Sequence, residues 1–218
     1  DYMGFSPHPT EANVFFSSGH FSYGGNIGFQ KSEDGGLTWK KVSDGVNGPV
    51  DFHAMAISSV NQNLIYGWYQ GNLQRSVDQG KNWEIVSRNL LPVFLVADSQ
   101  DESVVYAATL GGQGVMISQD KGATWTSLSP GLEGGAVSTI VVHPKDGNIL
   151  LVFSEKLGGL GKSTDRGKNW RKITESFNGE TVFHIAFDRN NPNVVYVLTQ
   201  ENKLYKSVDS GDTYKKIL

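Results

Sequence analysis

Two histidines and one aspartate are the residues of this chain whose types and spacing point most directly to chemistry. Asp51 and His53 lie two positions apart, and His20 lies in a glycine-rich stretch earlier in the chain. Neutral imidazole and carboxylate groups together suit zinc, copper, iron or manganese. The same groups can move protons in a hydrolytic reaction. Asp51 and His53 are therefore catalytic candidates, and Asp1, His20 and His53 are candidate ligands of a divalent metal.

A structural role is the alternative for these residues, in which the polar side chains only hydrogen-bond to one another at the rim of the fold. Neighbouring aromatic residues favour a binding site, because Tyr23 and Trp68 fall in the same region and could stack on a sugar ring. We therefore predict a ligand-binding role for His20, Tyr23 and Trp68. Packing between structural units is the competing role for Trp68.

The remaining histidines favour structural roles. His8 and His143 each precede a proline at equivalent points of the chain, as turn residues do. His184 lies in an apolar segment and is expected to pack against a neighbouring part of the fold.

Two known reaction types can be compared with the sequence. A glycosidase needs two carboxyl groups across a cleft. Glu155 and Glu180 lie on predicted loops that could face the same end of the fold as Asp51, but nothing in the sequence pairs them. A sialidase needs clustered arginines to bind a carboxylate, whereas the five arginines of this chain are dispersed among predicted turns and outer strands. Sialidase activity is therefore not expected, and the sequence leaves open whether the chain is an enzyme.

One short motif occurs five times and must position these residues. It reads Ser-x-Asp-x-Gly-x-(Thr/Asn/Ser)-aromatic, and its serines are 44, 42, 45 and 44 residues apart. The motif favours a tight turn, since Asp accepts hydrogen bonds from amides one or two residues ahead and Gly supplies a positive φ. We call this motif the turn box and expect it to join two strands of a hairpin. Its structural aspartates are Asp34, Asp78, Asp120, Asp165 and Asp209.

The spacing of the turn boxes predicts the fold. A repeat length in the low forties with four apolar segments per repeat is typical of β-propeller blades. The predicted fold is therefore all-β, a single β-propeller domain of four-stranded blades over residues 1–218. Five blades can close a ring alone or form part of a six- or seven-bladed ring, and the abrupt start on a strand favours the second. The blades are expected at about 1–45, 46–88, 89–130, 131–176 and 177–218.

Composition narrows the classes of partner. The formal net charge is −3, with 19 Lys and Arg against 22 Asp and Glu, and no face is obviously basic. Nucleic acid is therefore not an expected partner. The chain has no cysteine, which excludes disulfides and thiolate metal sites. It also has no run of 18 apolar residues, so no membrane span is expected.

The turn box resembles the Asp-box, or BNR repeat, and its five copies cover essentially the whole chain. Such propellers occur in sialidases, xyloglucan hydrolases, sortilin-type receptors and photosystem assembly factors, so the resemblance implies a fold and no single activity. The segments 1–6, 18–20 and 51–53 are also similar to exported prokaryotic proteins that carry a sialidase-like or glycosylhydrolase label without an established substrate. In that family further blade sequence precedes the first of these segments, which implies a longer parent chain.

These observations predict a ligand- or partner-binding module whose site lies at the mouth of the propeller channel. The resemblance implies that it is secreted, periplasmic or on the cell surface. A glycan or a protein is the expected ligand. The alternatives are a glycoside hydrolase-like or metal-dependent enzyme with its site near His20, Asp51 and His53, and a scaffold that assists assembly.

Overall fold

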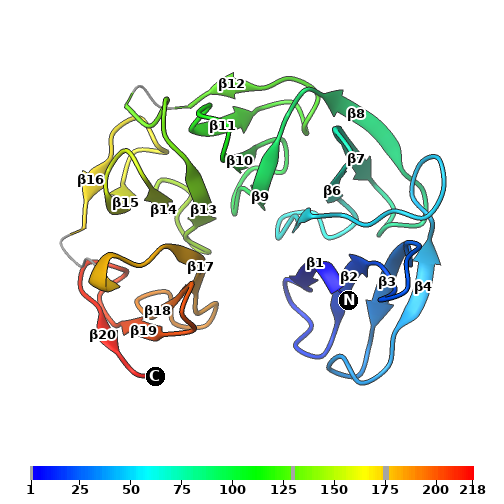
Figure 1. Ribbon diagram of the computed structural model, residues 1–218, viewed down its shortest axis with the longest axis horizontal. Helices are drawn as coiled ribbons and strands as arrows, with labels where there is room; N and C mark the ends of the chain where they lie inside the picture. Colours follow the sequence, from blue (N-terminus) through cyan, green and yellow to red (C-terminus); the bar gives the residue numbers. More distant parts are fainter. Residues whose placement is uncertain (1, 129–130, 174–176) are drawn as a thin grey trace. The chain divides into compact units, whose positions relative to one another are not determined.

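The computed structural model describes residues 2–128, 131–173 and 177–218. Within them the chain is almost entirely β-structure, in five antiparallel sheets of four strands each (Figure 1). In every sheet the strands follow one another in chain order, and each is hydrogen-bonded to the next. Five such sheets are the blades of a β-propeller, so the predicted fold class is confirmed.

The strands of the first three blades have the following bounds. The first blade contains β1 (Tyr2–Pro7), β2 (Phe15–Gly19), β3 (Phe29–Ser32) and β4 (Lys40–Ser43). The second contains β5 (Ala54–Ile57), β6 (Ile65–Tyr69), β7 (Asn72–Ser76) and β8 (Glu84–Arg88). The third contains β9 (Pro92–Ala97), β10 (Val105–Thr109), β11 (Val115–Ser118) and β12 (Thr126–Ser127).

The last two blades repeat this arrangement. The fourth blade contains β13 (Val137–Val142), β14 (Leu150–Ser154), β15 (Gly159–Ser163) and β16 (Arg171–Lys172). A short 3-10 turn, Phe177–Gly179, precedes the fifth blade. That blade contains β17 (Val182–Phe187), β18 (Val195–Thr199), β19 (Leu204–Ser207) and β20 (Lys215–Lys216).

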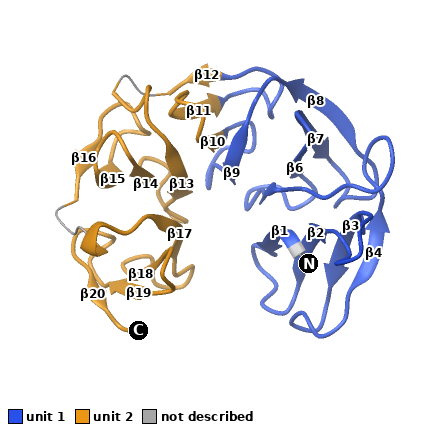
Figure 2. Cartoon of the chain, in the orientation of Figure 1, with its two compact units in different colours: residues 1–105, 118–125 blue, residues 106–117, 126–218 orange. Residues whose placement is uncertain are grey.

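The chain forms two compact units (Figure 2). The first comprises residues 1–105 and 118–125, and the second comprises residues 106–117 and 126–218. Each unit has its own apolar core. In the first unit Phe16, Phe29 and Phe52 are buried in one cluster, and in the second Phe177 and Tyr205 are buried in another. Burial of these side chains is the main force that holds neighbouring blades together.

The turn box joins the third and fourth strands of each blade, as predicted. In the third blade the Ser118 hydroxyl accepts the Gly122 amide at 2.8 Å and donates to Asp120 Oδ1 at 2.8 Å. Asp120 in turn accepts the Thr124 amide at 2.8 Å and the Thr124 hydroxyl at 2.6 Å. The expectation that the aspartate binds amides one or two residues ahead was wrong. The amide comes from four residues ahead, because the turn brings the start of the next strand back over the carboxylate.

The other four boxes make the same bonds from serine to aspartate and from the Thr or Asn back to the aspartate. In the first four boxes, the bond from the Thr or Asn side chain is the main reason why the aspartate pKa falls to about 2. At Asp209 burial opposes the shift, but bonds from Ser207 and Thr213 outweigh it and the pKa is again about 2.

Each turn box needs two successive residues with positive φ. The box glycine has a φ of 83° to 91° in every copy. The residue before it is also in the left-handed region, with φ values of 57° to 75°, although it is a glycine only in the first box. At Lys121 and Arg166 this conformation carries a steric cost. The hydrogen bonds of the box must therefore hold these residues in place.

The turns between the first and second strands of the blades share a hydrogen-bond pattern, which the sequence indicated only at His8 and His143. The Nδ1 atom of His8 accepts the Glu11 amide at 3.1 Å, and Nδ1 of His143 accepts the Lys145 amide at 3.2 Å. Ser58, Asp98 and Asp188 accept amides in the same way in the other blades. The prediction that His8 and His143 are turn residues is confirmed.

Candidate functional site

The candidate site lies in the first unit, where the segment from Val50 to His53 enters the second blade. Val50 and Phe52 point into the core, 1% and 0% exposed. The side chains of Asp51 and His53, the residues that follow Val50 and Phe52, contact each other. The amide of His53 donates to the Trp68 carbonyl at 3.0 Å, which fixes the segment to β6.

Close packing around Phe52 holds this segment against both blades. A Cβ atom at Gly67 would lie 2.5 Å from Phe52 Cγ, and one at Gly4 would lie 2.4 Å from the Phe52 carbonyl oxygen. The buried Ser18 hydroxyl accepts the Phe52 amide at 2.9 Å and donates to the Val50 carbonyl at 3.0 Å. The described residues 2–6 of the first segment that carries the narrower resemblance therefore meet segments 18–20 and 51–53 here.

The structure brings His20, Asp51 and His53 together. Asp51 Oδ2 is 2.9 Å from Nδ1 of His20 and 3.3 Å from Nε2 of His53. The Asp51 side chain is 7% exposed, whereas those of His20 and His53 are 35% and 49% exposed. The second Asp51 oxygen, Oδ1, is buried and has no hydrogen-bond partner among the described residues. A single buried carboxylate therefore holds two partly exposed imidazoles.

Hydrogen-bond chemistry sets the protons of this cluster. An ionised carboxylate only accepts, so Nδ1 of His20 and Nε2 of His53 carry the shared protons. In neutral His53 the other nitrogen, Nδ1, then has a lone pair that can accept a proton or a ligand hydroxyl. A carboxylate that orients an imidazole in this way is the arrangement of a general base.

Three polar or aromatic side chains border the cluster. The His53 ring centre is 6.4 Å from that of Trp68 and 6.3 Å from that of Tyr69. The Asn26 amide donates to the Tyr69 hydroxyl at 2.7 Å and to the Pro49 carbonyl at 2.9 Å. The sequence offered no signal for Asn26 beyond its position at the end of the glycine-rich loop.

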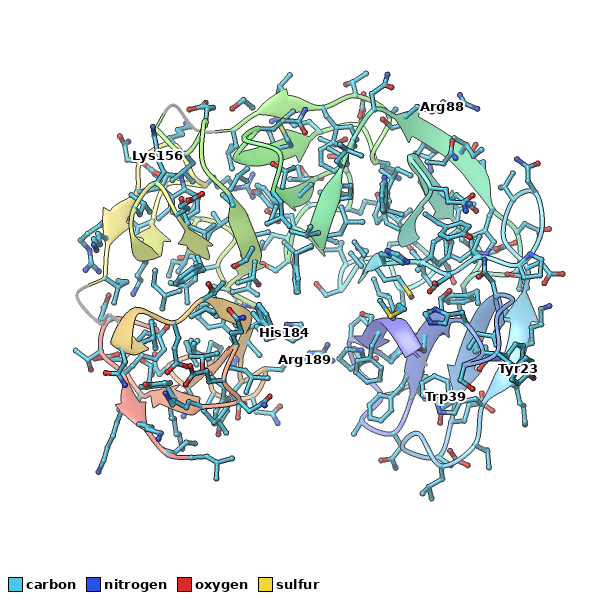
Figure 3. All side chains as sticks on the ribbon, viewed as in Figure 1. Tyr23, Trp39, Arg88, Lys156, His184 and Arg189 are labelled. Atoms are coloured by element: carbon cyan, nitrogen blue, oxygen red, sulfur yellow. The ribbon has the colours of Figure 1, made fainter. Side chains whose placement is uncertain are left out.

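The other candidates lie apart from this cluster or outside the described residues. Tyr23 is 84% exposed and stacks on Phe21, and Figure 3 shows it at the outer edge of the first blade. Asp1 lies outside the described residues. Among the described residues, the cluster of His20, Asp51 and His53 included, no three His, Asp or Glu side chains are grouped to hold a metal ion.

His184 lies on β17, in the apolar segment where the sequence placed it. Its side chain is exposed, and Figure 3 shows it near Arg189, which lies in the turn after β17. Burial among surrounding atoms lowers its pKa, although its ring keeps contact with solvent.

Comparisons with known proteins place the chain among propellers of several functions. A family model described as "Sortilin, neurotensin receptor 3" matches residues 158–218. A xyloglucanase of Paenibacillus sp is 25% identical over 83% of this chain and 22% of its own length. A vacuolar protein sorting/targeting protein 10 of Laccaria bicolor is 29% identical over 39% of this chain and 6% of its own length. The chain thus spans less than a quarter of each of these relatives.

Solved structures share the fold at lower sequence identity. A GH74 enzyme of Niastella koreensis superimposes with a TM-score of 0.74 at 20% identity, covering 99% of this chain and 38% of its own. A YCF48 structure bound to a D1 peptide gives a TM-score of 0.64 at 15% identity, covering 100% of this chain and 68% of its own. Both likenesses concern the propeller fold.

In the described residues no helix has the length and apolar character needed to cross a membrane.

Proposed function

We propose that this protein is a glycan-binding module whose ligand binds at His20, Asp51 and His53. The observation that carries the proposal is the buried Asp51 carboxylate, which holds two partly exposed imidazoles with one oxygen. Its other oxygen is buried without a partner among the described residues, which costs free energy. Proteins retain such groups mainly where function requires them.

The chemistry of the cluster suits a neutral sugar. The hydroxyl groups of a sugar both donate and accept hydrogen bonds, and the Nδ1 lone pair of His53 can accept one. The aromatic rings of Trp68 and Tyr69 beside His53 offer apolar faces against which the C–H side of a sugar ring can stack. The similarity to a xyloglucanase over most of this chain supports a β-glucan with side-chain sugars as the ligand class.

The remaining features of the proposal follow from the resemblance. We propose that the turn boxes are Asp-boxes with a purely structural role, and that residues 1–218 act as one propeller domain. The xyloglucanase and sorting-protein relatives support a location outside the cytoplasm, in the secreted, periplasmic or cell-surface space.

A glycoside hydrolase-like activity is the second candidate, and the Asp51–His53 pair favours it. In this alternative Asp51 orients the His53 ring, and Nδ1 of His53 takes a proton from the attacking water. Protonation of the leaving sugar would need a further acid. The release of reducing ends from xyloglucan, abolished by Asp51→Asn, would favour this candidate over binding alone.

The test is calorimetric titration of the protein with xyloglucan oligosaccharides. Asp51→Asn preserves the shape of the side chain but removes its charge, and His53→Ala removes a half-exposed ring. Each should weaken binding at least about tenfold, since a hydrogen bond involving a charged group contributes about 1.5–3 kcal/mol. Asp44→Asn is the matched control, because Asp44 is a half-exposed carboxylate in the same unit that pairs with Lys41.

Wild-type affinity in both cluster variants would refute the site. Binding of a peptide and of no glycan would refute the ligand class and favour the scaffold alternative, for which the likeness to peptide-bound YCF48 is the precedent.

A further inference from the structure

A pocket lies within the second unit, apart from the residues of the proposed site. Its volume is about 480 Å³, which falls in the range of small-molecule sites. It is framed by the turn after β14, the start of β15 and the segment between the 3-10 turn and β17. The side chains that matter for its chemistry are Leu110, Ser138, Phe153, Glu155 and Glu180. Glu155 and Glu180, which nothing in the sequence paired, therefore line one pocket.

Glu180 is a fixed carboxylate in the pocket wall. Its side chain is 9% exposed, and its two oxygens accept hydrogen bonds from Thr199 and Lys203. The bond from Lys203 holds the pKa of Glu180 below its usual value, so the group is ionised at neutral pH. Because Lys203 balances its charge, Glu180 acts as an oriented acceptor without attracting cations strongly.

Glu155 is the carboxylate in the pocket that can still accept hydrogen bonds from a ligand. Its Oε2 atom accepts the Ala136 amide at 3.1 Å, and its own amide donates to the Ala136 carbonyl at 2.9 Å. These two bonds fix the residue before any ligand arrives, which lowers the entropic cost of binding. No bond to its Oε1 atom is present among the described residues. The nearby Ser138 hydroxyl donates to the Val182 carbonyl at 2.7 Å and keeps its lone pairs for a ligand.

The opposite side of the pocket is apolar and open. Phe153 packs against the core of the second unit and also lines the pocket. Leu110 is 55% exposed at the rim. The neighbouring wall residues Gly158, Gly159 and Gly179 have no side chains, which leaves space over the phenyl ring.

Positive charge at the rim argues against a cationic ligand. The Lys172 ammonium group lies 3.3 Å from the position that a Cβ atom at Gly158 would take. Lys203 forms an ion pair with Glu180. The amino group of Lys156, labelled in Figure 3, approaches Gly134 instead. Lys172 and Lys203 therefore offset the charge of the two pocket carboxylates, which leaves no excess negative charge to select a cation.

We infer that this pocket is a second glycan subsite, which binds one sugar unit of a neutral glycan. The apolar face of the sugar ring lies against Phe153, and its hydroxyl groups donate to Glu155 and to the Ser138 oxygen. The inference takes its ligand class from the proposed function, but it rests on a separate set of residues. It gives the module a second point of attachment, within the second unit.

The experiment is an NMR titration of the isotope-labelled protein with a panel of neutral cello-, xylo-, manno- and xyloglucan oligosaccharides. Amide signals of residues 155–159 and 179–181 should shift on addition of at least one of these sugars. Glu155→Ala should weaken the response about tenfold, and Phe153→Leu should weaken it with the fold retained. Glu84→Ala is the control, since Glu84 is an exposed carboxylate on β8 that pairs with Arg75.

The outcomes separate this subsite from the first site. If pocket signals shift in Asp51→Asn as they do in the wild type, the pocket binds sugar whether or not the first site does. Pocket signals that stay unchanged with every sugar would overturn the inference, even if calorimetry still shows binding that depends on Asp51. A response to spermidine and to none of the sugars would overturn it as well.

Discussion

Replacement of a single box serine, Ser118→Ala, should destabilise the protein far more than its size suggests. Ser118 is 1% exposed, and its hydroxyl is the acceptor for the buried Gly122 amide at 2.8 Å. Alanine leaves that amide buried without a partner, at a cost of about 1–3 kcal/mol. It also removes the bond that Ser118 donates to Asp120 at 2.8 Å, which adds about 0.5–1 kcal/mol at this partly exposed position.

The expected total is about 1.5–4 kcal/mol of unfolding free energy, or a fall in melting temperature of about 3–16 °C for a chain of this length. Guanidinium unfolding followed by tryptophan fluorescence measures the first quantity, and circular dichroism during heating measures the second. Ser127→Ala is the matched control. The Ser127 hydroxyl donates to Glu133 at 2.8 Å but is exposed, so its loss should cost about 0.5 kcal/mol or less.

Equal stability of the two variants would refute the reasoning. It would mean that the Ser118 hydroxyl does not anchor the turn, or that water reaches the Gly122 amide in the variant. Hydrogen exchange at Gly122 separates these cases, since an amide open to water exchanges faster than a buried one.

The remaining predictions concern acid, glycine packing and one buried ion pair. Acid should destabilise the protein between about pH 4 and pH 2. The box aspartates have folded pKa values of about 2 against 3.8 in the unfolded chain, so their stabilisation is complete above the unfolded value and is lost as pH falls through the folded one. An unfolding midpoint that stays constant from pH 5 to pH 2 would contradict this. Gly80→Ala should cost about 2–5 kcal/mol, because φ is 83° and the new Cβ atom would lie 2.1 Å from Phe29 Cε1. Gly71→Ala, with a φ of 79° but open space around it, should cost only about 1–2 kcal/mol, and denaturant unfolding compares the two. Asp212→Ala should destabilise the protein more than Lys162→Met, because it leaves the Lys162 ammonium group, which is 7% exposed, without its carboxylate partner. The opposite order of melting temperatures would contradict this prediction.

The spacing of the turn boxes was enough to predict the five blades, because a repeated turn at a fixed interval leaves only enough chain for four strands between copies. It could not show that residues such as Lys121 adopt a positive φ of 58°. That conformation depends on the cooperative bonds of the whole box, which favour a backbone shape that the residue type alone disfavours. Local composition therefore predicted where the chain turns, but it did not predict the backbone conformation of the residues in the turn.

The limits of each strand were harder to predict where polar residues are buried. Ser17 and Ser18 are polar residues that directly precede a glycine-rich stretch, yet both lie in β2 and are 0% exposed. Ser17 donates to the Gly4 carbonyl at 2.7 Å, and Ser18 bonds to the segment that enters the second blade. Hydroxyl groups that satisfy backbone partners in this way can be buried as readily as apolar side chains.

The meeting of His20, Asp51 and His53 followed from the fold, since neighbouring blades bring the ends of equivalent strands together. The atoms that each imidazole uses and the unpartnered Oδ1 could not be predicted, because they depend on side-chain rotamers. The same is true of the pocket in the second unit. Glu155 and Glu180 are separated in sequence, and only the folded loops place both in one wall.

The two bonds to Asp51 differ in what they connect. The bond to His53 joins residues two positions apart at the entrance to the second blade, whereas the bond to His20 crosses from the first blade to the second. A small change in the angle between these blades would therefore stretch the His20 bond and leave the His53 bond intact. The NMR signals of the His20 ring would therefore report changes in the contact between the first and second blades without any added probe.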